Sequence, residues 1–95
     1  MTINEALKRF RKKHTTLTLR ILTDDDPEGV FQDVLIQGKA AALLSLADLL
    51  VAVATEKEED VQIAPFGAGS VLFSKESTVG IYLSRVGKRS PRRKR

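Results

Sequence analysis

The sequence predicts an α+β fold in two layers, a mainly antiparallel sheet of order β-β-α-β-β-β with one long helix on one face, preceded by an N-terminal amphipathic helix. Apolar residues recur at helical spacing near the N-terminus and again over residues 39–57. Elsewhere apolar and polar residues alternate with the period of two that is typical of strands. The turns between the last strands are too short for crossover connections, so we expect neighbouring strands to be antiparallel.

Charge divides the 95 residues into three segments. Residues 1–13 carry five basic side chains and one acidic side chain, a balance of +4, and residues 87–95 carry six basic side chains, a balance of +6. Residues 14–86 hold five basic and eleven acidic side chains, a balance of −6. We therefore predict a basic N-terminal helix over 1–13, an acidic α+β domain over 14–86, and a disordered basic tail over 87–95.

The first segment has the sequence features of a capped helix. Thr2 and Glu5 have the T-x-x-E spacing of a capping box, in which each side chain accepts a hydrogen bond from the other residue's backbone N–H. An apolar stripe follows on one side, with the basic residues opposite; it consists of Ile3, Ala6, Leu7 and Phe10. We expect this helix to dock on the domain through its stripe.

Two strands should follow the helix. From His14 onward, leucine and isoleucine alternate with polar residues up to Ile21. A turn cluster over 24–29 separates this strand from a second one, Val30–Gln37. A short loop between neighbouring strands predicts an antiparallel hairpin, which ends where Gly38 breaks the pattern.

The central helix is expected over Lys39–Lys57 and has two unequal faces. The broad apolar face, which we expect on the sheet, consists of Leu43, Leu46, Ala47, Leu50, Val53 and Ala54. The opposite face carries small residues and Asp48, flanked by Leu44 and Val51, so something should cover these two side chains. We expect the N-terminal helix to do so; the alternative is the same face of a second subunit, with Leu44, Asp48 and Val51 as interface residues.

Three short strands are predicted after the acidic linker Glu56–Asp60: Val61–Ala64, Ser70–Ser74 and Thr78–Arg85. The segment Pro65–Ser70 contains two glycines, but no G-K-S/T follows and a strand comes next, so it does not predict a phosphate loop. We interpret it as a tight turn with a positive φ at Gly67 or Gly69.

The basic side chains are the candidate nucleic-acid or ribosome contacts, because each Lys or Arg that reaches a phosphate releases a counterion. In the N-terminal helix they are Lys8, Arg9, Arg11, Lys12 and Lys13, and in the tail they are Lys88, Arg89, Arg92, Arg93, Lys94 and Arg95. Within the tail, Ser90-Pro91-Arg92-Arg93 resembles the S-P-(K/R)-(K/R) repeats of histone and protamine tails. The alternative is a solvated terminus that meets polyanions only incidentally.

Acidic side chains in the hairpin turn form a second candidate contact, for a cationic protein; they are Asp24, Asp25, Asp26 and Glu28. Their spacing is not that of a calcium loop, and a solvated turn is the alternative reading. With no Cys, one His and no nucleophile motif, we predict no catalytic residue, no metal site and no cofactor.

The stretch Val34–Gly38, followed by A-L-L-S-L-A-D-L-L over 42–50 and then Ala54, resembles the small α/β immunity proteins of bacterial polymorphic toxin systems. The resemblance covers residues 30–85. It implies a protein without enzymatic activity that blocks a cognate toxin by stoichiometric binding. An acidic body suits a cationic toxin, whereas basic arms are unusual on an inhibitor of nucleases.

Three functional hypotheses follow. The first is an adaptor, not an enzyme, whose basic arms contact nucleic acid or ribosome while its acidic domain contacts a protein. The second is an immunity-like inhibitor, and the third is a homodimeric module. The apolar run Ala40–Ala54 is shorter than the ~20 residues of a membrane span, and we see no signal peptide or cysteine. We therefore expect no membrane contact and a cytoplasmic location.

Overall fold

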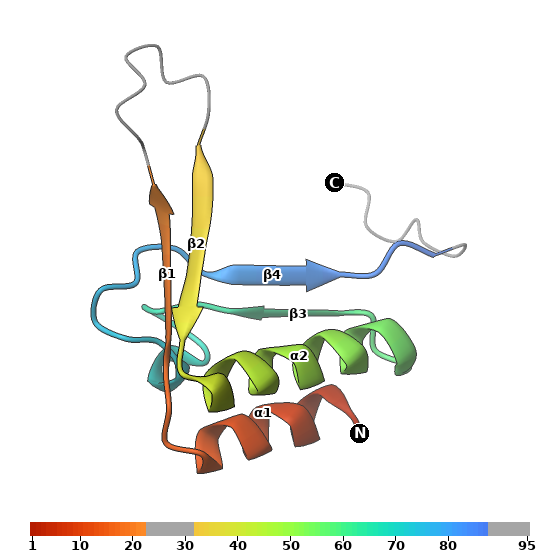
Figure 1. Ribbon diagram of the computed structural model, residues 1–95. Helices are drawn as coiled ribbons and strands as arrows, with labels where there is room; N and C mark the ends of the chain where they lie inside the picture. Colours follow the sequence, from red (N-terminus) through yellow and green to blue (C-terminus); the bar gives the residue numbers. More distant parts are fainter. Residues whose placement is uncertain (23–31, 88–95) are drawn as a thin grey trace.

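The computed structural model describes residues 1–22 and 32–87 and confirms an α+β architecture that begins with a helix. Two helices pack with two small antiparallel sheets (Figure 1). In chain order the elements are α1 (Ile3–Lys12), β1 (Leu17–Leu22), β2 (Asp33–Gly38), α2 (Ala40–Thr55), β3 (Asp60–Ile63), the 3-10 turn η1 (Ser70–Leu72) and β4 (Ile81–Ser84).

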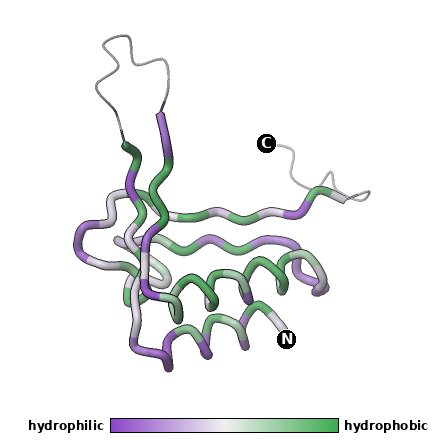
Figure 2. The backbone as a smooth tube through the Cα atoms, viewed as in Figure 1, coloured by the Kyte–Doolittle hydropathy of each residue, from purple (hydrophilic) through white to green (hydrophobic). Residues whose placement is uncertain are grey.

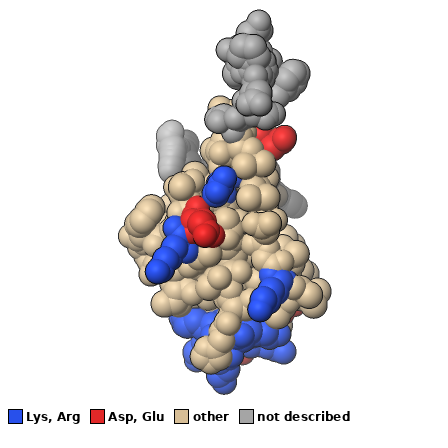
Figure 3. Space-filling view, turned by 60° about the vertical axis from the view of Figure 1, so that its left-hand side comes forward, with Lys and Arg blue, Asp and Glu red and all other residues tan. Residues whose placement is uncertain are grey.

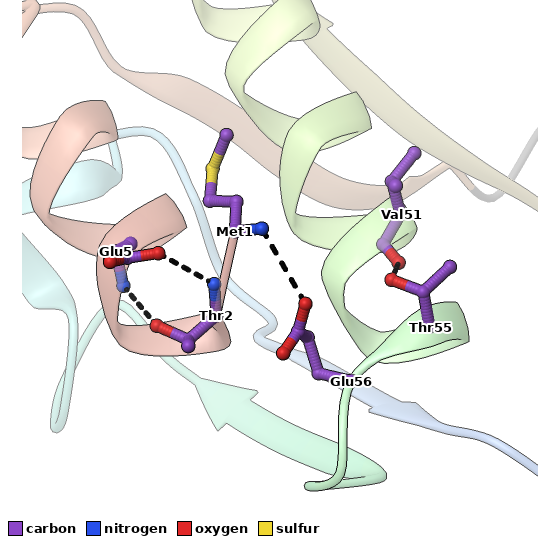
Figure 4. Close-up of polar contacts among 6 residues, drawn as sticks. All are labelled: Met1, Thr2, Glu5, Val51, Thr55 and Glu56. Carbon is purple, nitrogen blue, oxygen red and sulfur yellow. Dashed lines mark hydrogen bonds and ion pairs between the residues drawn. The ribbon is translucent and has the colours of Figure 1, made fainter.

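The capping box at the start of α1 is confirmed. The Glu5 backbone N–H donates to Thr2 Oγ1 across 3.1 Å, and the Thr2 backbone N–H donates to Glu5 Oε1 across 2.9 Å (Figure 4). Two of the donors that every helix leaves unpaired at its N-terminus are thereby satisfied.

The predicted hairpin is also confirmed, with β1 and β2 antiparallel in a register that runs from Leu17 opposite Gly38 to Leu22 opposite Asp33. The hairpin stands away from the body of the molecule (Figure 1). Leu17 and Leu19 point into the core and are at most 2% exposed. Ile21 lies on the same face two residues further along and is 43% exposed, because the hairpin has by then left the body.

The predicted single five-stranded sheet is wrong. Strands β3 and β4 form a separate antiparallel pair, with Ile63 opposite Ile81. Within the expected strand Ser70–Ser74, residues Ser70–Leu72 form the 3-10 turn η1, and Phe73 forms an isolated bridge with Leu17 of β1. The reason is Gly69, whose φ of 79° turns the chain into η1 instead of extending it. The positive φ predicted at Gly67 or Gly69 therefore lies at Gly69.

The second edge of β1 is paired by the irregular segment 73–79. The backbone N–H of Ser74 donates to Leu17 O across 2.7 Å, and that of Thr78 donates to Leu19 O across 2.9 Å. Between these two bonds, the Ser77 hydroxyl contacts β1 directly. The segment thus supplies the partners that a third strand would supply.

Helices α1 and α2 lie side by side and run in opposite directions (Figure 1). The amino group of Met1 therefore reaches Glu56 Oε2, 3.5 Å away, just beyond the C-terminus of α2 (Figure 4). The Arg85 guanidinium donates to the carbonyls of Ala54 and Glu56 across 2.8 and 3.0 Å. Two positive groups thus meet the negative end of the α2 dipole.

The core lies where both helices meet the base of the hairpin, β3 and η1. Its buried apolar members are Ile3, Ala6, Phe10, Leu17, Leu19, Ala42, Leu46, Leu49, Ala52, Val53, Ile63, Leu72 and Phe73.

The predicted inner face of α2 is wrong in part. Leu46 and Val53 are buried, but Leu43 and Leu50 are 42% and 47% exposed. Ser45 lies in the core instead, because α1 packs closely along the small residues of α2. Helix α2 is apolar on every side along its length (Figure 2), so its sequence does not determine which side faces inward.

Candidate nucleic-acid interface

The candidate interface is the solvent face of α1. In the space-filling view, Lys and Arg side chains gather at the lower end of the molecule, the level at which α1 lies in Figure 1 (Figure 3). All five predicted basic residues of this arm are exposed: Lys8, Arg9, Arg11, Lys12 and Lys13.

Helical periodicity places these cations outward. Ile3, Ala6 and Phe10 are 4%, 1% and 1% exposed, which fixes one side of α1 against the core. Positions three and four residues away from each other share a side of a helix, so the basic residues occupy the remaining side together. The docked stripe thus holds the cations in a fixed row.

Glu5 is the single acidic residue of α1, and its carboxylate closes the capping box. The hydrogen bond from the Thr2 backbone is the main cause that lowers the pKa of Glu5. Loss of solvent opposes it, and the N-terminal charge, the Thr2 hydroxyl and Lys8 lower the pKa further. Glu5 therefore stays ionised, and its charge is directed to the start of the helix.

No ion pair joins the row of cations to the acidic side chains that the structure describes. Within residues 1–22 and 32–87, the ion pairs are Met1 with Glu56 and Arg85 with Glu59, and neither involves a basic side chain of α1. The N-terminal segment folds back onto the domain through the apolar stripe of α1 and the ion pair between the Met1 amino group and Glu56.

Two shallow hollows adjoin the row. One of about 370 Å³ is lined by Met1, Glu5, Lys8, Arg9 and Lys12. The other, about 300 Å³, lies at the C-terminal end of α1 between Arg11, the turn residues His14, Thr15 and Thr16, and η1. A guanidinium beside two threonine hydroxyls is a set of donors that suits a phosphate.

The turn residues of the second hollow were not predicted as part of a site. His14 has a φ of 52°, which redirects the chain from α1 into the extended segment before β1. Histidine is among the residues that adopt this conformation more readily than most. The change of period at His14 marks the turn in the sequence, but not the approach of η1, which depends on the tertiary fold.

The remaining predicted contacts divide into two groups. The basic tail residues Lys88–Arg95 and the acidic turn residues Asp24–Asp26 and Glu28 lie outside the described residues. Leu44 and Val51 are 64% and 60% exposed and Asp48 is half-buried, so α1 does not cover them and that expectation is wrong.

The acidic linker is engaged within the molecule. Glu56 pairs with the Met1 amino group, and Glu59 Oε2 lies 3.5 Å from Arg85 Nη2. Asp60 begins β3 opposite Ser84. Glu58 is exposed, whereas Glu56, Glu59 and Asp60 are partly buried.

No protein-family model, curated protein or solved structure matches this chain. Over the described part of the chain, no helix is both long and apolar enough to cross a membrane. In the same part, no three His, Cys, Asp or Glu side chains come together as a metal site would require.

Proposed function

We propose that this chain is a binding protein without enzymatic activity, and that α1 contacts the phosphate backbone of a nucleic acid, free or in a ribosome. The observation that carries the proposal is a row of five exposed cations on a helix whose opposite side is buried in the core. The backbone of this helix is held in place before binding, so little backbone order has to be gained on contact.

The contact we propose is electrostatic and independent of base sequence. Lysine and arginine on one side of a helix reach phosphates, while the exposed face of α1 offers no aromatic side chain on which a base could stack. The basic tail, at the other end of the chain, adds six cations that can reach the same polyanion. The acidic domain, with its balance of −6, is then available to a protein partner.

A membrane surface is the main competitor for an amphipathic basic helix. Interfacial helices insert their apolar side among the lipids. In α1 that side is occupied by the core, since Phe10 is 1% exposed. Lipid binding would require α1 to leave the domain, which favours nucleic acid as the partner.

The test is the salt dependence of nucleic-acid binding by the full chain. Substituting Lys8 and Lys12 by Gln removes two cations of the row, whereas substituting the exposed Lys57 and Lys75 by Gln removes the same charge elsewhere. Each lost phosphate contact lowers the slope of log K against log salt by about 0.9 on duplex DNA. We expect a decrease of nearly two for the first pair and little change for the second.

Equal slopes of log K against log salt for the two pairs of substitutions would contradict a role for α1 in nucleic-acid binding. Deletion of residues 88–95 is measured separately, because it reports on the tail alone. Retention of the full slope after both the deletion and the α1 substitutions would contradict the proposal as a whole.

An immunity-like inhibitor is the second candidate, based on the resemblance of residues 30–85. It would use the acidic turn and the linker Glu56–Asp60. Two linker carboxylates are already paired inside the molecule, which weakens this candidate. Charge reversal at Asp24–Asp26 should slow association with a cationic toxin encoded beside the gene; a gene far from any toxin argues against it.

A further inference from the structure

The outer face of α2 is an apolar surface without a partner in the described residues. It consists of Ala40, Leu43, Leu44, Ala47, Leu50, Val51 and Ala54, all of them exposed. Its four large side chains are 42–64% exposed. A helix that is apolar on every side is ordinarily buried on every side.

Along this face, side chains at equal distances in sequence on either side of Ala47 are similar in size. Leu44 and Leu50 lie three residues to either side of it, Leu43 and Val51 lie four residues away, and Ala40 and Ala54 lie seven residues away. Small and large positions therefore match when the face is turned end over end. A two-fold interface requires that the face be complementary to a second copy of itself, with residue i of one copy meeting residue j of the other and the reverse.

Helical geometry gives the pairs that such an interface would form. When two copies of α2 cross antiparallel at Ala47, the two-fold axis keeps each residue on its own side of the seam. Leu44 therefore lies next to Val51 of the partner subunit, and Leu43 lies next to Leu50 of the partner subunit. The three alanines recur every seven residues along the seam, so they lie on one line, where small side chains allow close approach. Asp48 lies about 100° around the helix from Ala47, so the carboxylates of the two copies lie on the same edge of the seam, outside the line of alanines.

The chemistry of the face also favours a second copy over a charged partner. Asp48 is the single charged residue in α2, and it lies at the edge of the face. A cationic or acidic protein would find no opposite charge here. An identical apolar face supplies matching chemistry and the matching order of sizes.

We propose that the chain forms a two-fold homodimer through the outer face of α2, with the antiparallel helices crossing at Ala47. This proposal is independent of nucleic-acid binding, because the row of cations lies on α1. The interface is small, since it consists of four large side chains and three alanines per copy, so the dimer should dissociate on dilution.

The first test is sedimentation of the full chain over a range of concentrations. Val51→Glu places a carboxylate in the seam twice, because the interface is symmetric, and should shift the monomer–dimer equilibrium toward monomer by at least about tenfold. Val71→Glu is the matched control: Val71 is 64% exposed, as Val51 is 60%, but it lies in η1. We expect the control to associate as the parent does.

The second test uses the absence of cysteine from the chain. Helices in contact at 8–10 Å bring Cα atoms on the seam within the ~4.4–6.8 Å that a disulfide spans. Ala47→Cys lies on the two-fold axis and should link to its own copy on mild oxidation. Chains that carry Ala54→Cys alone should form no disulfide with one another. A mixture of Ala40→Cys chains and Ala54→Cys chains should form a disulfide between the two kinds of chain.

Two results would overturn the proposal. One is a strict monomer at all concentrations, which would leave the face to a different protein. The other is linkage of Ala54→Cys chains to one another without linkage of Ala47→Cys chains, which would indicate a different crossing. Circular dichroism of each variant checks that it folds, and the exposure of the substituted side chains makes folding the expected outcome.

Discussion

The backbone N–H of Leu19 donates a hydrogen bond to the buried hydroxyl of Ser77 across 3.1 Å. The same hydroxyl donates to Leu17 O, also across 3.1 Å. One side chain thus satisfies a donor and an acceptor on the edge of β1. Because Ser77 is 3% exposed, water cannot readily take its place.

Ser77→Ala should lower the free energy of unfolding by about 1–3 kcal/mol, since it leaves the Leu19 N–H without its partner, whereas Leu17 O keeps the bond from the Ser74 N–H. Urea denaturation followed by circular dichroism measures the change. Ser84→Ala removes an exposed hydroxyl from β4 and serves as the control, with an expected change within about 0.5 kcal/mol. Equal effects of the two substitutions would show that the Ser77 bonds do not stabilise β1.

Arg85 fixes the C-terminus of α2 from a distant point in the chain. Its guanidinium donates to two carbonyls at the end of the helix and lies 3.5 Å from Glu59. Arg85→Gln should cost about 1–2 kcal/mol of stability, because the helix has no basic residue of its own in the last turn. Arg85→Lys keeps the charge without the planar fork, so thermal denaturation should place it between the parent and Arg85→Gln.

The sequence predicts what local patterns determine. The T-x-x-E spacing and the stripe that includes Phe10 predict α1, and alternation predicts the β1–β2 hairpin; both are confirmed. The amphipathic pattern of α1 also predicts which side carries its exposed cations. Where one signal identifies both the element and its inward side, the prediction is reliable.

The parts that failed lack such a signal. Helix α2 is apolar on every side, so periodicity could not decide between Leu50, which is exposed, and Leu49, which is buried. The segment after Gly69 contains apolar residues at alternate positions, but it joins β1 through separate backbone bonds and the Ser77 hydroxyl instead of a continuous strand ladder. The second hollow depends on η1 approaching His14, which is a tertiary contact.

The capping box should make α1 sensitive to acid. The lowered pKa of Glu5 means that its ionised form is favoured in the folded state. Its contribution to stability is therefore present above the pKa of glutamate in the unfolded chain, and is lost as pH falls through the lower, folded pKa. The parent should lose this contribution on acidification, whereas Glu5→Gln has none to lose.

The measurement is thermal unfolding of the parent and of Glu5→Gln across the acidic range. The two curves should differ most near neutral pH and converge at low pH. Asn4→Ala, at an exposed position in the same turn, is the control and should follow the pH profile of the parent. A constant gap between the parent and Glu5→Gln at every pH would contradict the ionic origin of the cap.

Gly69 is the position at which the chain departs from the predicted strand. Its φ of 79° disfavours any side chain, and a Cβ there would lie 2.7 Å from Ile63 Cγ2. A Cβ at Gly67, two residues earlier, would have no neighbouring atom within 4 Å. Gly69→Ala should therefore destabilise the protein by about 1–3 kcal/mol, through backbone strain and displacement of Ile63 from the core.

Gly67→Ala should be neutral or stabilising by up to about 1 kcal/mol, because it restricts the unfolded chain. Urea denaturation of the two variants separates these effects, and equal stabilities would show that η1 does not require glycine at its start.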